Sequence, residues 1–261
     1  MGRIVGLVVA FAALSALFAL LQRAASSKAA LPLSRRGFGT DALYWLFTAL
    51  VTRPATRATV LIAALLLIAL TGHRLSAQDV MHGHGPVALL PLWVQGAILL
   101  VAMDFVAYWS HRLFHGRALW RFHAIHHSST DLDWLSATRL HPVNDVLTRL
   151  FQVAPFLALG AAPAALAGAA PILALYAIFI HADVGWDFGP LRYVIATPAF
   201  HRWHHALEDD GRDRNFAGLL PLWDLLFGTF DMPRGAAPAR FGTASPVPQG
   251  MIGQMLYPFR A

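Results

Sequence analysis

Histidines with the spacing of metal ligands are the most informative feature of this sequence. The segment HRLFHGRALWRFHAIHH, residues 111–127, contains five of them, and HRWHH, residues 201–205, contains three more. Most of the spacings are i,i+3 or i,i+4, which place side chains on one face of a helix. Imidazole is the commonest protein ligand for metal ions. The candidate ligands are therefore His111, His115, His123, His126, His127, His201, His204 and His205.

The number of these histidines predicts a site for two metal ions. A lone histidine would more often be a surface residue or a hydrogen-bonded core residue, but three clusters are not expected by chance among 13 histidines in 261 residues. A closed structural zinc site uses four ligands. Eight or nine nitrogen ligands would let each of two metals take four or five and keep an open position, as catalysis requires. Imidazole suits zinc, copper, iron and nickel alike, so these ligands alone leave the metal open.

The composition predicts a membrane protein and excludes several classes of metal centre. Hydrophobic residues make up 57% of the chain and charged residues only 13%, which is unusual for a soluble domain. The absence of cysteine excludes iron-sulfur clusters and thiolate-ligated haem. Glu208 is the only glutamate, so neither the Glu-rich ligand set of bundle-type di-iron proteins nor the H-E-x-x-H motif of zincins is present. No nucleic-acid-binding motif accompanies the net charge of +6.

The amino-terminal third of the chain predicts two spans and one interfacial helix. Residues 4–22 form an apolar stretch long enough to cross a membrane, and we expect it to be retained rather than cleaved as a signal peptide. The run DALYWLFTALVT is too short to cross alone, so we expect an interfacial or re-entrant helix that ends at Arg53 and Pro54. A second, short span is expected at about residues 58–71.

The middle of the chain predicts a third span and a helical hairpin. The span covers about residues 87–110 and runs directly into the first histidine cluster. Residues 146–180 are apolar, and we expect them to form a hairpin that enters and leaves the membrane on one side. The expected breaks lie at Pro155, at residues 160–163 and at Pro171.

Two further polar residues in these apolar segments are candidates for the site. His181 directly follows the hairpin and brings the number of candidate ligands to nine. Asp104 lies one heptad before His111, on nearly the same helix face. An acid at membrane depth is usually functional or paired, so we expect Asp104 to support a metal-bound imidazole or to make a structural hydrogen bond. The glycine-flanked His82 and His84 are expected to lack the rigid geometry of a metal site.

The distribution of basic residues predicts the orientation in the membrane. With the amino terminus outside, only Arg3 and Arg74 of the 20 Lys and Arg residues lie outside, in agreement with the positive-inside rule. All three histidine clusters then lie on the cytoplasmic side. We therefore expect an all-α, integral membrane protein of about four spans plus an interfacial helix, with a cytosolic His-rich helical cap.

The motifs together resemble those of a known superfamily. HRLFH, HAIHHSS, RLHP and TPAFHRWHH, followed by NFAGLLPLWDLLFGTF, are similar to the fatty acid hydroxylase/sterol desaturase superfamily of integral-membrane di-iron enzymes, over about residues 97–230. The resemblance implies two iron ions, O2 and two electrons from a reductase, ferredoxin or cytochrome. It also implies hydroxylation or desaturation of a lipid or sterol-like substrate. Ala217, where a glycine is often seen, and Leu225, where an arginine is usual, depart from the pattern.

The resemblance also carries site residues onto this chain. It implies that the eight histidines of the motifs are ligands, it adds His181, and it leaves His141 either as a ligand or as a support for one. We expect residues 1–261 to form a single membrane-embedded catalytic domain. Its expected parts are N-terminal spans and interfacial helix at 1–72, a fatty acid hydroxylase-like core at 87–230 and a C-terminal tail at 231–261.

Two other classes of function are compatible with a histidine-rich membrane protein. A metal transporter or storage protein would need polar ligands spread along the interior of several spans, whereas these cluster at the expected helix ends. A di-zinc membrane hydrolase would use the same ligands, because zinc can substitute for iron at imidazole sites.

Overall fold

The chain folds into long helices capped at one end by short ones. The computed structural model describes residues 2–25, 35–72, 76–207, 213–233 and 237–260. Across these ranges, extended pairing is limited to one bridge between Ala206 and Phe241. Four helices are long and apolar enough to cross a membrane: Ile4–Ala25, Phe38–Leu70, Leu92–Phe114 and Pro163–Ile180. The expected all-α membrane fold with about four spans is confirmed.

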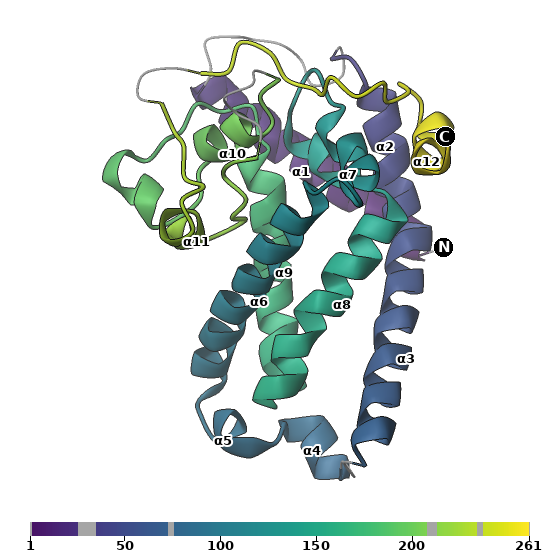
Figure 1. The fold of residues 1–261 in the computed structure, drawn as a ribbon, viewed down its shortest axis with the longest axis vertical. Helices are drawn as coiled ribbons and strands as arrows, with labels where there is room; N and C mark the ends of the chain where they lie inside the picture. The colour runs from purple at the N-terminus through teal and green to yellow at the C-terminus, as the bar shows by residue number, and fades with distance from the viewer. Residues whose placement is uncertain (1, 26–34, 73–75, 208–212, 234–236, 261) are drawn as a thin grey trace.

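The first helix, α1 (Gly2–Ala25), packs through one face. Its Phe18 is buried and stacks on Trp134, with ring centroids 5.3 Å apart. Val184 belongs to the same buried cluster. In Figure 1, α1 passes obliquely behind the cap. Large apolar side chains elsewhere on α1, among them Val8 and Leu20, are exposed, as expected for a helix that faces lipid.

The second apolar segment is one continuous helix and not two separate pieces. α2 (Phe38–Phe47) continues through a π-helical turn (Thr48–Thr52) into α3 (Arg53–Thr71). The expected helix end at Arg53 and Pro54 is therefore wrong. Proline removes a backbone donor and crowds the preceding turn of a regular helix. The wider π-helical turn directly before Pro54 accommodates both effects, so the helix continues.

The third span, α6 (Leu92–Phe114), begins after Pro91 and ends with His111 in its last turn. Its start is later than expected, because Gly85–Ala88 forms a separate short helix, α5. Leu99 and Met103 of α6 are buried against a row of alanines from the expected hairpin. Small residues let helix backbones approach closely, which suits packing in a membrane.

The hairpin consists of α8 (Pro142–Leu159) and α9 (Pro163–Ile180), which run antiparallel beside α6 in Figure 1. Gly160 ends α8 with a φ of 62°, a left-handed conformation that glycine adopts without strain. The break expected at residues 160–163 is therefore present. The breaks expected at Pro155 and Pro171 are wrong, since both prolines lie inside helices. In apolar surroundings a continued helix keeps the neighbouring backbone groups hydrogen-bonded.

The glycine-rich turn around His84 packs against the end of this hairpin. The backbone N–H of His84 donates to Gly160 O at 2.7 Å. Gly83 has a φ of 82°, and a Cβ there would overlap the backbone of Gly160 and Ala161. The turn between α4 (Ala77–His82) and α5 is thus held by close backbone packing, and His82 and His84 belong to neither group of candidate metal ligands among the described residues.

The cap lies at the opposite end of the long helices from α4 and α5 (Figure 1). Its helices are short because the segments that connect and follow the spans have only short apolar stretches and contain frequent prolines and glycines. Its helical elements are α7 (Trp120–His127), η3 (Trp134–Thr138), η4 (Gly189–Tyr193), α10 (Pro198–His204), α11 (Leu222–Leu226), α12 (Met251–Leu256) and η5 (Tyr257–Phe259).

Candidate metal centre

Nine histidines gather in the cap as two adjacent groups. Within each group, one ring nitrogen of every member lies within 4.8 Å of the others. The five-histidine group contains His111, His115, His123, His127 and His204, and the four-histidine group contains His126, His181, His201 and His205. The structure thus brings together all eight motif histidines and His181.

Helix geometry explains how neighbours in sequence are divided between the groups. On α7, His123 and His127 are four residues apart and point to the five-histidine group, whereas His126 points to the other. On α10 and its C-cap, His201 and His205 share the four-histidine group, while His204 joins His123 and His127. Each H-x-x-H-H motif therefore supplies ligand candidates to both groups, so the two groups must lie side by side.

Most of the rings are held by a hydrogen bond from the Nδ1 atom to an oxygen acceptor. The Nδ1 atoms of His111, His181 and His204 lie 2.8, 2.6 and 2.6 Å from the carbonyl oxygens of Phe216, Ala177 and Arg214. A carbonyl oxygen can only accept, so each of these Nδ1 atoms carries the proton. The Nε2 atom of each neutral ring then presents a lone pair, and these lone pairs point into the groups.

The Nε2 atoms approach one another at distances that fit ligands of a shared cation. His126 and His201 each place Nε2 at 3.1 Å from His181 Nε2, and His201 Nε2 is 3.1 Å from His205 Nε2. In the other group, His123 Nε2 lies 3.0 Å from His111 Nε2 and 3.2 Å from His127 Nε2. Nitrogens bound to one ion at about 2.1 Å are about 3.0–3.4 Å apart in octahedral or tetrahedral geometry.

Burial keeps these imidazoles neutral. Removal from water lowers the pKa of His126, His127 and His205 well below the ordinary histidine value, and neighbouring histidines lower it further. Two neutral rings whose lone pairs face each other at this distance repel unless a cation lies between them. The Nε2 atom of His204 is buried and finds no hydrogen-bond partner in the described parts of the chain. The donor set therefore fits one metal ion in each group.

The loop after α10 supplies several of the acceptors, and its residues were not among the predicted site residues. Asn215 donates from Nδ2 to Phe200 O at 3.1 Å and accepts at Oδ1 from Asp231 N at 2.8 Å. Asp224 accepts from the N–H groups of Phe216 and Ala217 at 2.8 and 2.9 Å. These bonds fix the carbonyl of Phe216 beside His111. The signal in the sequence was the NFAGLLPLWD segment itself, which places an amide and a carboxylate close to the third cluster.

Two other candidates lie apart from the nine rings. His141 belongs to neither group: its Nδ1 atom accepts from Val143 N at the start of α8, and Nε2 donates to Met255 O at 3.3 Å. Asp104 accepts three hydrogen bonds of 2.9 Å, from the backbone N–H groups of Leu219 and Leu220 and from Trp223 Nε1. Of the two roles considered for Asp104, these contacts correspond to the structural hydrogen bond.

Comparison with known proteins identifies the family. A sequence model described as fatty acid hydroxylase matches residues 96–229, which include all nine histidines. The chain belongs to the fatty acid hydroxylase family. The departures from the family motif are accommodated locally: Ala217 is buried with its N–H bonded to Asp224, and Leu225 is exposed.

Several proteins related to this member of the fatty acid hydroxylase family have names that describe the modification of lipids. The ornithine lipid hydroxylase OlsE of Rhizobium tropici is 31% identical over 179 residues, 68% of this chain and 54% of that protein. The alkylglycerol monooxygenase of Homo sapiens is 37% identical over 132 residues, 50% of this chain and 29% of that protein. A very-long-chain aldehyde decarbonylase, GL1-5 of Oryza sativa subsp. indica, is 29% identical over 167 residues, 54% of this chain and 25% of that protein.

The match covers only part of each relative. The chain spans about half the length of the ornithine lipid hydroxylase and less than a third of the alkylglycerol monooxygenase. No solved structure matches the chain significantly.

Proposed function

We propose that this protein is an iron- and O2-dependent oxidoreductase that hydroxylates or desaturates a C–H bond of a lipid at the two histidine groups. The observation that carries the proposal is the division of nine imidazoles, eight of them buried and that of His111 half-buried, into groups of five and four at the end of apolar helices. Such a metal pair, when bound, supplies the activation of O2 that attack on an unactivated C–H bond requires. The names of the relatives, ornithine lipid hydroxylase and alkylglycerol monooxygenase, favour hydroxylation of a polar lipid.

The residues of the chain would hold the two metal ions and orient the imidazole rings. His111, His115, His123, His127 and His204 would hold one ion, and His126, His181, His201 and His205 the other. The carbonyl acceptors at Phe216, Ala177 and Arg214 keep the rings in the tautomer that binds metal. The rings of Phe114, Trp120 and Phe216 pack against histidines of the five-histidine group, and such apolar cover would limit the access of water and side reactions of O2.

The reaction implies a partner protein. Insertion of one oxygen atom of O2 into a C–H bond reduces the other atom to water, which consumes two electrons and two protons. The chain has no cysteine for an iron-sulfur cluster. We therefore propose that a reductase, ferredoxin or cytochrome delivers the electrons.

The same proposal includes the cytoplasmic orientation of the histidine groups. Residues 76–91, at the opposite end of the long helices, contain no Lys or Arg, whereas residues 112–149 at the histidine end contain five. Positive residues accumulate on the cytoplasmic side of membrane proteins. Labelling of a single cysteine introduced at exposed Val80 in intact cells tests this orientation, and protection from an impermeant reagent would contradict it.

The function is tested by comparing the lipids of cells that produce the wild-type chain or His204→Ala. A lipid whose mass increases by one oxygen, or decreases by two hydrogens, is expected only with the wild type. His141→Ala serves as the matched control, because this buried histidine lies outside both groups. The purified protein is expected to contain two irons and to consume O2 with this lipid. Two stably bound zinc ions without O2 consumption would favour a hydrolase and contradict the proposal.

A further inference from the structure

A buried network of ion pairs joins the membrane helix α2 to the four-histidine group. Asp41, in the first turn of α2, is fully buried. Its Oδ1 atom accepts from Arg139 Nε at 2.5 Å, and its Oδ2 atom accepts from Arg35 Nη2 at 2.7 Å. Arg35 also donates from Nε to Asp133 at 2.6 Å. Two carboxylates and two guanidinium groups thus balance each other in charge, as burial of charged groups requires.

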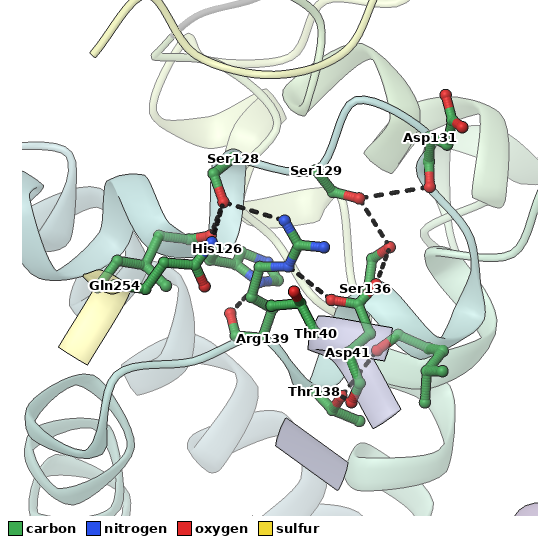
Figure 2. Close-up of polar contacts among 12 residues, drawn as sticks. Thr40, Asp41, His126, Ser128, Ser129, Asp131, Ser136, Thr138, Arg139 and Gln254 are labelled. Atoms are coloured by element: carbon green, nitrogen blue, oxygen red, sulfur yellow. Dashed lines mark hydrogen bonds and ion pairs between the residues drawn. The ribbon is translucent and has the colours of Figure 1, made fainter. Parts of the chain in front are cut away.

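Arg139 is the member of this network that reaches a ligand candidate. Its backbone carbonyl lies 3.3 Å from Nδ1 of His126 and accepts the proton of that ring. Its Nη1 atom donates to Ser128 Oγ at 3.1 Å, and Ser128 is the C-cap of α7, the helix that carries His126. Figure 2 shows the guanidinium group between Ser128 and Asp41, with His126 next to the backbone of Arg139.

Asp41 also holds the segment between the ligand helix and Arg139. Asp133, which is tied to Asp41 through Arg35, caps η3 by accepting from the N–H groups of Leu135 and Ser136. The backbone carbonyl of Asp41 accepts from Thr138 Oγ1 at 3.2 Å. Residues 133–139 are therefore held at both ends, at Asp133 through Arg35 and at Thr138 and Arg139 through Asp41 of α2, so the carbonyl of Arg139 has little freedom to move.

We propose that Asp41 is a positioning residue for the four-histidine group: through Arg139 it holds the carbonyl group that fixes the tautomer and orientation of His126. Asp41 lies outside residues 96–229, the part matched by the family model. The amino-terminal helices would then contribute to the metal centre as well as to membrane insertion. This inference rests on the proposed function, since it assumes that the four-histidine group binds a metal ion.

The test compares metal affinities of the full-length chain purified in detergent. Co(II), whose visible absorption reports its coordination, is titrated into the metal-free wild type and Asp41→Asn in competition with a chelator. The wild type is expected to bind two ions. Asp41→Asn is expected to bind the ion of the five-histidine group normally and the other about ten- to a hundredfold more weakly. Asp145→Asn is the control, because Asp145 accepts from Thr56 between α3 and α8 and contacts no member of the network.

A double-mutant cycle separates positioning from general loosening. If Asp41 acts through His126, the Asp41→Asn substitution should weaken Co(II) binding no further in a His126→Ala background. Additive losses would overturn the inference, as would wild-type affinity for both ions in folded Asp41→Asn. If Asp41→Asn does not fold, Ser128→Ala removes one neutral contact of Arg139 and is expected to weaken the same ion about two- to tenfold. Unchanged affinity in Ser128→Ala would then overturn it.

The two proposals can fail separately. A wild-type chain that binds no metal ion contradicts the proposed function. A wild type with two bound ions, together with an Asp41→Asn variant that also holds both, contradicts only the role of Asp41.

Discussion

The Nδ1 atom of His111 donates to the carbonyl oxygen of Phe216, which lies 105 residues further along the chain, at 2.8 Å. His111 is in the last turn of α6, and Phe216 is in the loop between α10 and α11. The orientation of a ring on a membrane helix thus depends on the conformation of a loop in the cap. Asn215 shapes that loop with a φ of 56° and hydrogen bonds to Phe200 and Asp231.

Asn215→Ala is expected to weaken metal binding by the five-histidine group. A left-handed φ costs alanine about 1–2 kcal/mol, and the lost side-chain bonds cost about 1 kcal/mol each. The displaced Phe216 carbonyl should lower metal affinity about ten- to a hundredfold. Chelator competition measures this, and Asn215→Gly is the control that loses the same bonds without the strain. Unchanged affinity in Asn215→Ala would show that the loop does not orient His111.

Asp104→Asn is expected to lower stability without removing metal. An amide in place of the carboxylate turns one oxygen acceptor into a donor that faces the N–H groups of Leu219, Leu220 or Trp223. One unsatisfied buried donor costs about 1–3 kcal/mol. The carbonyl of Phe216 should stay in place, because Asp224 holds that part of the loop independently. Thermal unfolding and metal content in the same detergent measure both effects; a folded variant that lost an ion would instead assign Asp104 to the metal centre.

The sequence predicted which histidines gather but not how they divide. The i,i+4 spacing of His123 and His127 follows from local helix geometry and needs no tertiary information. His126 joins the other group because α9 and α10 bring His181 and His201 to that side of α7. Such an assignment depends on where distant helices end. For the same reason, the heptad spacing between Asp104 and His111 predicted the helix face on which Asp104 lies. It did not predict that Asp104 would accept hydrogen bonds from the segment that leads into α11.

Proline was a misleading signal in the apolar segments. Pro54, Pro155 and Pro171 each predicted a helix end, yet all three lie in continuing helix. Where no water can satisfy freed backbone groups, the chain keeps its helix and adjusts locally, as the π-helical turn before Pro54 does. Gly160 was a reliable signal, because its left-handed conformation ends α8 directly.

Gly83→Ala is expected to destabilise the end of the bundle that lies opposite the histidines. The new methyl group would overlap the backbone of Gly160 and Ala161, and Gly83 already has a φ of 82°. Backbone overlap and an unfavourable φ should together cost about 2–3 kcal/mol. Gly85→Ala is the matched control, because Gly85 has a φ of 77° but open space around it. The difference in thermal midpoint between the two variants isolates the close contact, and equal midpoints would show that the backbones do not pack as described.

His141→Ala is expected to leave two metal ions bound and to reduce stability only moderately. His141 caps α8 by accepting from Val143 N, and its ring packs edge-on against Phe122 and Phe259. Loss of a cap costs about 1 kcal/mol, with a further contribution from the lost aromatic packing. His141→Asn should recover the cap, because asparagine is a good capping residue. Chelator competition with His141→Ala beside His126→Ala makes the comparison: only the latter should bind one ion more weakly, and a folded His141→Ala with one weakened ion would identify His141 as a ligand.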